Sequence, residues 1–159
     1  MLNPDKNQSG AQAQGARLRV GIAGLGVAST QVLPAFHDKA PYDLIAGADV
    51  RADARQAFEQ QYDRPALASV EELARRPDVD AIWIATPNVV HAEHAVCAAQ
   101  HGKHVICEKP IAVTLEECDR MIAAAEKNGV RFLQGHSKIY QAPIKAIRGA
   151  IRNLVQFPN

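Results

Sequence analysis

An apolar run that breaks into a glycine turn constrains this chain more than any other feature. The run from Leu18 to Ala23 has the length and branched side chains of a buried parallel strand, and Gly24 and Gly26 follow it where the chain must turn sharply. A helix is expected to begin near Ala28, with its free N–H groups and positive dipole end facing the turn. This strand, turn and helix together predict a binding site for a pyrophosphate.

An acidic residue after the next apolar run strengthens that prediction. Asp49 directly follows the run from Leu44 to Ala48, where a carboxylate can accept hydrogen bonds from the ribose of an adenine nucleotide. A carboxylate repels a 2′-phosphate and therefore favours NAD, whereas Arg51 softens that preference and keeps NADP as the alternative. A purely structural turn would explain the glycines alone, but the order of strand, turn, helix, strand and acid favours a dinucleotide site.

Size and composition indicate one globular domain. The 159 residues are 47% hydrophobic and 22% charged, with a net charge of +1, which argues against a nucleic-acid or membrane partner. Residues 1–16 are polar and are expected to be a disordered tail rather than a signal peptide, which leaves 17–159 as the domain. Cys97, Cys107 and Cys118 are odd in number and widely spaced, so we expect no disulfide framework and a cytoplasmic location.

Strand and helix patterns alternate along the rest of the chain. Capping boxes at Ser69 and Thr114 mark two helix starts. Right-handed crossovers convert such alternation into an α/β fold, a doubly wound parallel sheet of the Rossmann type, with ligands at the carboxyl ends of its strands. The expected helices cover 30–37, 53–62, 69–76, 90–100, 114–128 and 143–154, and the further strands cover 80–85, 103–107 and 130–134, with 66–67 a poor strand at best.

Two further loops are predicted at the carboxyl edge of this sheet. Thr86, Pro87 and Asn88 are expected to line the crevice beside the cofactor, although a role as helix cap would explain Asn88 equally well. Glu108-Lys109-Pro110 follows the next strand; a solvated ion pair before a turn is the structural alternative. At this edge, however, Lys109 could hydrogen-bond a substrate hydroxyl and stabilise the alkoxide that forms as hydride leaves.

Histidines near the same edge allow several interpretations. His91, His94 and Cys97 recur at helical spacing, but no partner set of carboxylates or thiolates accompanies them, so we predict no metal site. We expect His91 to face the crevice as a neighbour of the cofactor. His136 ends the last strand, where a role toward substrate and a purely structural role are equally compatible with the sequence.

Together these motifs resemble the glucose-fructose oxidoreductase, inositol dehydrogenase and rhizopine catabolism (Gfo/Idh/MocA) family. The resemblance rests on the glycine turn, Asp49, the stretch 79–88 with His91, and the stretch 102–110, and Gly135-His136-Ser137 is most similar to the phthalate dihydrodiol dehydrogenase group. It implies hydride transfer between NAD(P) and a secondary alcohol, with Lys109 as the catalytic lysine. The cofactor-binding positions it implies are Gly24, Leu25, Gly26, Val27, Ala28, Asp49, Arg51, Thr86, Pro87, Asn88, His91, Glu108 and Lys109.

The resemblance covers only one part of such an enzyme. Members of the family continue into a second domain that supplies the substrate pocket, and this sequence ends at Asn159, where that domain should begin. We therefore expect the C-terminal substrate domain to be absent from this chain and an apolar surface to be left open for a homo-oligomer. Small-molecule substrates, namely cyclic diols, inositols or sugars, fit the enzyme hypothesis; a non-catalytic NAD(H)-binding or sensing module and a decayed remnant are the alternatives.

Overall fold

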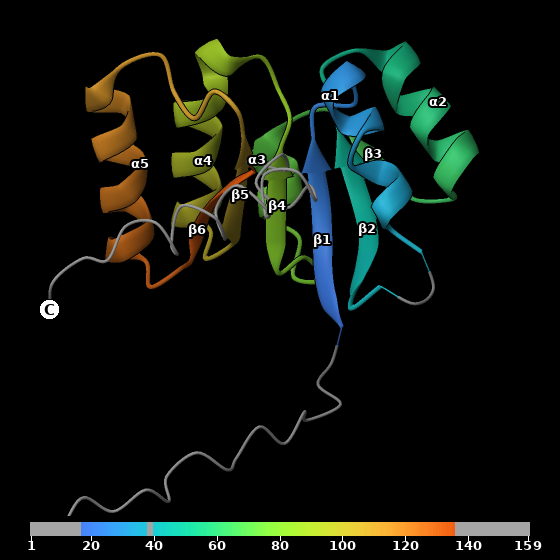
Figure 1. Ribbon diagram of the computed structural model, residues 1–159. Coiled ribbons are helices and arrows are strands. Elements are labelled where there is room, and N and C mark those ends of the chain that lie inside the picture. Colours follow the sequence, from blue (N-terminus) through green and yellow to red (C-terminus); the bar gives the residue numbers. More distant parts are fainter. Residues whose placement is uncertain (1–16, 38–39, 136–159) are drawn as a thin grey trace, which may run out of the picture.

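A six-stranded parallel sheet with helices on both faces forms the body of the protein (Figure 1). The computed structural model describes residues 17–37 and 40–135. The strand order is β3-β2-β1-β4-β5-β6, and every neighbouring pair is parallel. The strands are β1 (Leu18–Ala23), β2 (Tyr42–Ala48), β3 (Ala66–Leu67), β4 (Ala81–Ile84), β5 (His104–Glu108) and β6 (Phe132–Gly135).

The connections between strands cover the sheet in two groups. In Figure 1, α1 (Val27–Thr30) and α2 (Ala52–Tyr62) lie beside β1 and β2, whereas α4 (His91–Gln100) and α5 (Leu115–Lys127) lie together over the half that contains β5 and β6. The short helices η1 (Leu33–Ala35), α3 (Val70–Ala74) and η2 (Asn88–Val90) complete the described elements. The predicted doubly wound α/β fold is therefore confirmed.

Two apolar cores reflect these two layers. One core contains Leu73 of α3, the alanines of α4, Met121 of α5 and the sheet residues Ile84 and Val105. The other contains Ile22, Val32, Leu33, Leu44 and Phe58. Because β1 is buried from both sides, its sequence reads as the continuous apolar run seen before the glycine turn.

The predicted helix over 30–37 is wrong. The segment instead forms the single turn α1 and, after a break, the 3-10 turn η1 with Pro34 inside it. Proline provides no N–H for a continuous ladder, and the Ser29 and Thr30 hydroxyls donate to the carbonyls of Gly26 and Val27 at 2.7 Å. A one-turn helix has only a small dipole, so an anion at this turn would depend on individual amides rather than on a macrodipole.

The two capping boxes are confirmed with one difference in their return bond. The Ser69 hydroxyl accepts from the Glu72 amide at 3.1 Å, and the Thr114 hydroxyl accepts from the Glu117 amide at 3.2 Å. Each glutamate carboxylate accepts from the amide that precedes the capping residue, not from the capping residue itself. The last predicted helix, 143–154, and His136 lie outside the described residues.

An ion pair joins two central strands at the amino edge of the sheet. The Arg19 guanidinium donates to both carboxylate oxygens of Asp80, at 2.9 and 2.6 Å, and the Arg19 amide donates to the same carboxylate at 2.9 Å. These hydrogen bonds hold the pKa of Asp80 at about 2, below its usual value of 3.8. The pair therefore contributes to stability at neutral pH and loses that contribution as the pH falls toward the pKa of the folded state.

We expect Asp80→Asn to lower the melting temperature by a few degrees at pH 7, because the substitution removes the ion pair between β1 and the start of β4. The difference from the wild type should shrink as the pH is lowered from about 4 to about 2, since Asp80 then becomes protonated in both states. Thermal unfolding followed by circular dichroism measures both effects. Asp119→Asn, an exposed position on α5, is the control, and an equal effect of the two variants would contradict the prediction.

Candidate functional site

Three loops converge at the carboxyl edge of the sheet, around the point where the chain winding reverses. β1 pairs with β2 on one side and with β4 on the other, so the connections after β1 and β4 leave the sheet in opposite directions. The glycine turn follows β1, the loop 86–88 follows β4, and the loop 108–110 includes the end of β5 and its continuation. The structure thus brings the three predicted loops to one edge (Figure 1).

Gly24 and Gly26 serve different purposes in the first loop. Gly24 has a φ of +92°, and a Cβ atom there would lie 2.6 Å from the Ala85 carbonyl oxygen, so this position fixes the close approach of two loops. A Cβ atom on Gly26 would meet no other atom within 4 Å. The space next to Gly26 is therefore open, and the first amides of the following helical turn have no intrahelical acceptor. Such a turn can accept a pyrophosphate.

Asp49 lies beside this turn, as predicted, but its carboxylate is already engaged. One oxygen accepts from the Leu25 amide at 2.9 Å, and the other accepts from the Arg51 amide at 2.9 Å and from the Arg51 Nε at 3.2 Å. Burial raises the pKa of Asp49, but the hydrogen bonds from Arg51 and Leu25 outweigh burial and lower it below its usual value. Asp49 therefore holds the glycine turn against the end of β2.

Arg51 covers this carboxylate from the solvent side. The Arg51 side chain is 54% exposed, whereas the Asp49 side chain is 9% exposed. The positive charge of the pair thus lies at the rim. The predicted role of Asp49 toward a ribose remains a prediction, and the structure adds that its carboxylate is paired with Arg51.

An apolar cavity of about 340 Å³ lies next to this pair. It opens between the ends of β2 and β4 and the start of α3, and it has room for a planar aromatic base. Val50, Val70, Val90 and His94 line it, and the sequence analysis assigned none of them to a cofactor site. The topology alone could have indicated these residues, because residues that directly follow adjacent parallel strands lie at one edge of the sheet whether or not they belong to a motif.

The two histidines of α4 lie differently from each other. The Nδ1 atom of His94 lies 3.0 Å from the Thr86 hydroxyl at the edge of this cavity, and burial lowers its pKa. His91 is 1% exposed; its Nδ1 lies 2.9 Å from the Pro110 carbonyl oxygen and its Nε2 lies 2.8 Å from the Thr86 carbonyl oxygen. The buried His91 ring thus connects the two loops through their backbone carbonyls. This corrects the expectation that the ring faces the crevice. In the described part of the chain, no three potential ligands group into a metal site.

Asn88 does not cap the helix that follows it. It begins η2, and Val90 occupies the N-cap position of α4 with no side-chain hydrogen bond. Asn88 is exposed at the edge of the site, so its predicted role toward the cofactor remains a prediction.

Lys109 lies at the far end of the same edge from Asp49. The preceding Glu108 accepts a hydrogen bond from the Trp83 indole at 3.2 Å and one from the Lys109 amide at 3.3 Å, which fixes the start of this loop. Within 17–37 and 40–135, the Lys109 ammonium forms no hydrogen bond or ion pair, and its side chain is exposed. A substrate oxygen could therefore approach it without displacing a partner.

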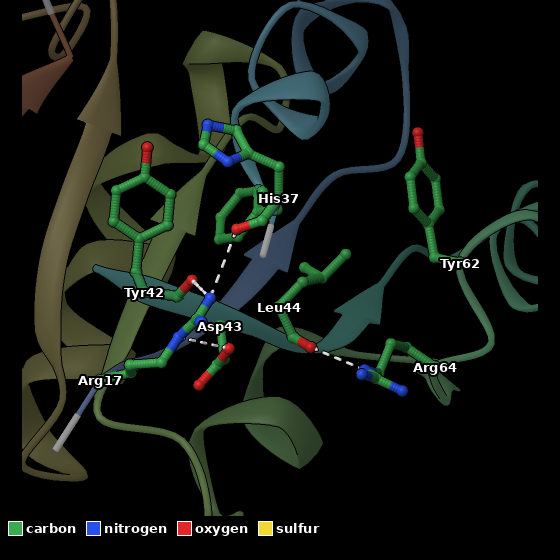
Figure 2. A pocket seen from close by; sticks show the side chains of 8 residues that line it. Arg17, His37, Tyr42, Asp43, Leu44, Tyr62 and Arg64 are labelled. Atoms are coloured by element: carbon green, nitrogen blue, oxygen red, sulfur yellow. Dashed lines mark hydrogen bonds and ion pairs between the residues drawn. The ribbon is translucent and has the colours of Figure 1, made fainter. Parts of the chain in front are cut away.

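A second cavity, of about 150 Å³, lies at the opposite edge of the sheet (Figure 2). Its polar groups hold the backbone: Arg17 pairs with Asp43 at 2.9 Å and donates to the carbonyls of His37 and Tyr42, and Arg64 donates to the Leu44 carbonyl at 2.8 Å. This cavity is separate from the three loops.

None of the helices in the described ranges is both long and apolar enough to span a bilayer.

The fold and the glycine turn define a dinucleotide-binding Rossmann domain. The chain belongs to the Gfo/Idh/MocA oxidoreductase family, because the profile of that family, described as an oxidoreductase family with an NAD-binding Rossmann fold, matches residues 18–136. The resemblance stated from the motifs is thereby confirmed.

Curated and solved relatives agree with this assignment. The chain is 38% identical over 135 residues to the 1-carboxy-3-chloro-3,4-dihydroxycyclo hexa-1,5-diene dehydrogenase of Comamonas testosteroni, covering 84% of this chain and 34% of that protein. It is 31% identical to the scyllo-inositol 2-dehydrogenase (NADP(+)) IolU of Bacillus subtilis, covering 82% and 40%. The WlbA dehydrogenase of Bordetella pertussis, solved with NADH and UDP-GlcNAcA, superposes with a TM-score of 0.81 at 29% identity, covering 86% and 42%. The chain spans about two fifths or less of each relative's length.

We expect Arg51→Ala to weaken the binding of NADPH about tenfold more than that of NADH, because the substitution removes a charge-assisted partner for a 2′-phosphate and exposes the charge of Asp49. Fluorescence titrations with both reduced cofactors measure the ratio. Arg120→Ala, an exposed arginine of α5, is the control. An equal loss of affinity for the two cofactors would contradict this assignment of Arg51.

Proposed function

We propose that this chain is the cofactor-binding part of an oxidoreductase that transfers a hydride between NAD(P) and a secondary alcohol on a cyclic diol, inositol or sugar-like ring. One observation carries the proposal: the open glycine turn, the apolar cavity beside Asp49 and the exposed Lys109 ammonium, which has no partner among the described residues, lie along one edge of the sheet. The adenine would occupy the cavity, the pyrophosphate would lie against the turn at Gly26, and the nicotinamide end would extend toward Glu108 and Lys109.

Lys109 would be the residue that acts on substrate. NAD(P), when bound, supplies the hydride acceptor or donor. The Lys109 ammonium would donate a hydrogen bond to the substrate oxygen and stabilise the negative charge that develops there. Glu108 would keep the loop in place through its bonds to Trp83 and to the Lys109 amide.

The relatives support this broad class of substrate. The names of two of them specify a dihydroxylated ring and an inositol, and a third is solved with a nucleotide sugar. For this chain we propose a polyhydroxylated small molecule of that kind. Because Cys97, Cys107 and Cys118 are free, we also propose a reducing, cytoplasmic location.

Self-association is the second part of the proposal. Trp83, Ile106 and Leu133 follow one another in register across β4, β5 and β6; Leu133 is 58% exposed and the other two are partly exposed. An apolar row that stays partly open on one face of a sheet is typical of contact surfaces. We propose that this region contacts another copy of the chain or another domain.

The direct test is a titration with NADH, followed by energy transfer from Trp83, the only tryptophan. We expect saturable binding that Gly26→Ala weakens more than tenfold, because its new methyl group enters the space proposed for the pyrophosphate. The free energy of unfolding of this variant should stay within about 1 kcal/mol of the wild type, since no protein atom opposes the methyl group. An NADH affinity that is equal in the wild type and in Gly26→Ala would contradict the proposed site.

A turnover assay separates an enzyme from a passive cofactor-binding module. With NAD⁺ or NADP⁺ and a panel of inositols, cyclic diols and sugars, we expect cofactor reduction that Lys109→Ala lowers by about 10²-fold or more, while NADH binding changes less than about twofold. Lys127→Ala, at the end of α5, is the matched control. NADH binding without turnover of any substrate in the panel would instead favour the non-catalytic module.

A further inference from the structure

The buried ring of His91 is a titratable group at the site edge that the proposed hydride transfer does not use. It lies in the first turn of α4, is 1% exposed, and contacts two backbone carbonyls that belong to different loops. One carbonyl, of Thr86, belongs to the loop that follows β4. The other, of Pro110, immediately follows Lys109. The ring therefore connects the proposed cofactor loop to the loop of the proposed catalytic lysine.

The chemistry of the two contacts sets a condition on the ring. A carbonyl oxygen only accepts hydrogen bonds, so both ring nitrogens must donate if both contacts, at 2.9 and 2.8 Å, are hydrogen bonds. A neutral imidazole has one N–H and one lone pair, and the lone pair would then face a carbonyl oxygen. The two-bond arrangement is that of the doubly protonated ring.

We propose that His91 is a positioning residue which, when both its nitrogens carry protons, ties the carbonyls of Thr86 and Pro110 together and fixes the Lys109 loop relative to the cofactor loop. Loss of one proton releases one of the two bonds, so the placement of Lys109 depends on the protonation state of this ring. The part of this inference that concerns the cofactor rests on the proposed function; the protonation and the bridge do not.

The charged and titratable groups near this ring come from α4 and from the segment around Pro110. On α4 itself these are Glu93 and His94. In the segment around Pro110 they are Glu108 and Lys109, together with the Cys107 thiol, which donates to the Ile111 carbonyl at 3.6 Å. The Cys107 thiol remains protonated throughout the range where histidine titrates, because burial raises its pKa to about 12. His94 is the other histidine of this helix, and burial, with a smaller contribution from the charge of His91, lowers its pKa.

The experiment is a pH titration of the full chain by NMR, with ¹⁵N-labelled histidine rings and backbone amides. Over the pH range in which the chain stays folded, we expect two ring N–H signals for His91 at the acidic end. The amide signals of Lys109 and Ile111 should shift together with any loss of one of these ring signals. A single ring proton on His91 throughout this range would overturn the proposal without any variant being needed.

Two variants separate His91 from the other histidines. His91→Phe keeps a planar ring but has no donors, and we expect the pH-dependent shift of the Lys109 and Ile111 amides to disappear. His101→Gln removes the exposed histidine at the end of α4, whose ring contacts Cys97 of its own helix, and should leave the shift unchanged. Persistence of the shift in His91→Phe would overturn the proposal; if that variant does not fold, His91→Gln, which cannot bridge both carbonyls, replaces it.

NADH affinity adds a readout that distinguishes this inference from the proposed function. We expect His91→Phe to weaken NADH binding about tenfold, with the wild type approaching the variant as the pH rises. If the wild-type chain binds no NADH at any pH, the proposed function fails, while the ring protons and the loop amides still decide the role of His91. If NADH binds and its affinity is the same in His91→Phe at every pH, the bridge has no effect on the site and the inference fails alone.

Discussion

The pairing of β1 with both β2 and β4 is the constraint on which the site depends. Parallel strands place their carboxyl ends at one edge, and the reversal of winding at β1 separates the loops that follow β1 and β4. The Gly24 amide donates to the Ala48 carbonyl at 2.7 Å, and its missing side chain allows contact with Ala85. A backbone position without a Cβ thus holds three strand ends together, and the open side of the turn is a consequence of that packing.

Local sequence signals determined most of the fold. The apolar runs at 18–23, 44–48 and 80–85 could be identified because strands buried on both faces have no polar alternation, and the capping boxes marked the starts of α3 and α5. The failure at 30–37 has a local cause as well, since Pro34 interrupts the ladder of a pattern that is otherwise helical. Apolar periodicity indicated a helix, and the missing N–H prevented it.

The sequence predicted where the candidate site lies in the fold, but not which side chains contact one another there. Spacing placed Asp49, Thr86 and Lys109 at one edge, because topology alone brings the strand ends together. The pairing of Asp49 with Arg51 and the burial of His91 depend on side-chain directions that follow from tertiary packing. The apolar cavity was missed for the same reason, since Val50, Val70 and Val90 come from three separate connections.

The pairing of Asp49 with Arg51 changes how cofactor choice should be read from such a sequence. An acid after the second strand ordinarily favours NAD because it accepts from the ribose hydroxyls and repels a phosphate. Here both carboxylate oxygens already accept hydrogen bonds, from the Leu25 amide and from Arg51. The guanidinium is the more exposed group of the pair, and in the proposed site it would donate to a phosphate as readily as to a hydroxyl. The same two residues therefore fit either cofactor, and the balance depends on whether ribose binding opens the ion pair.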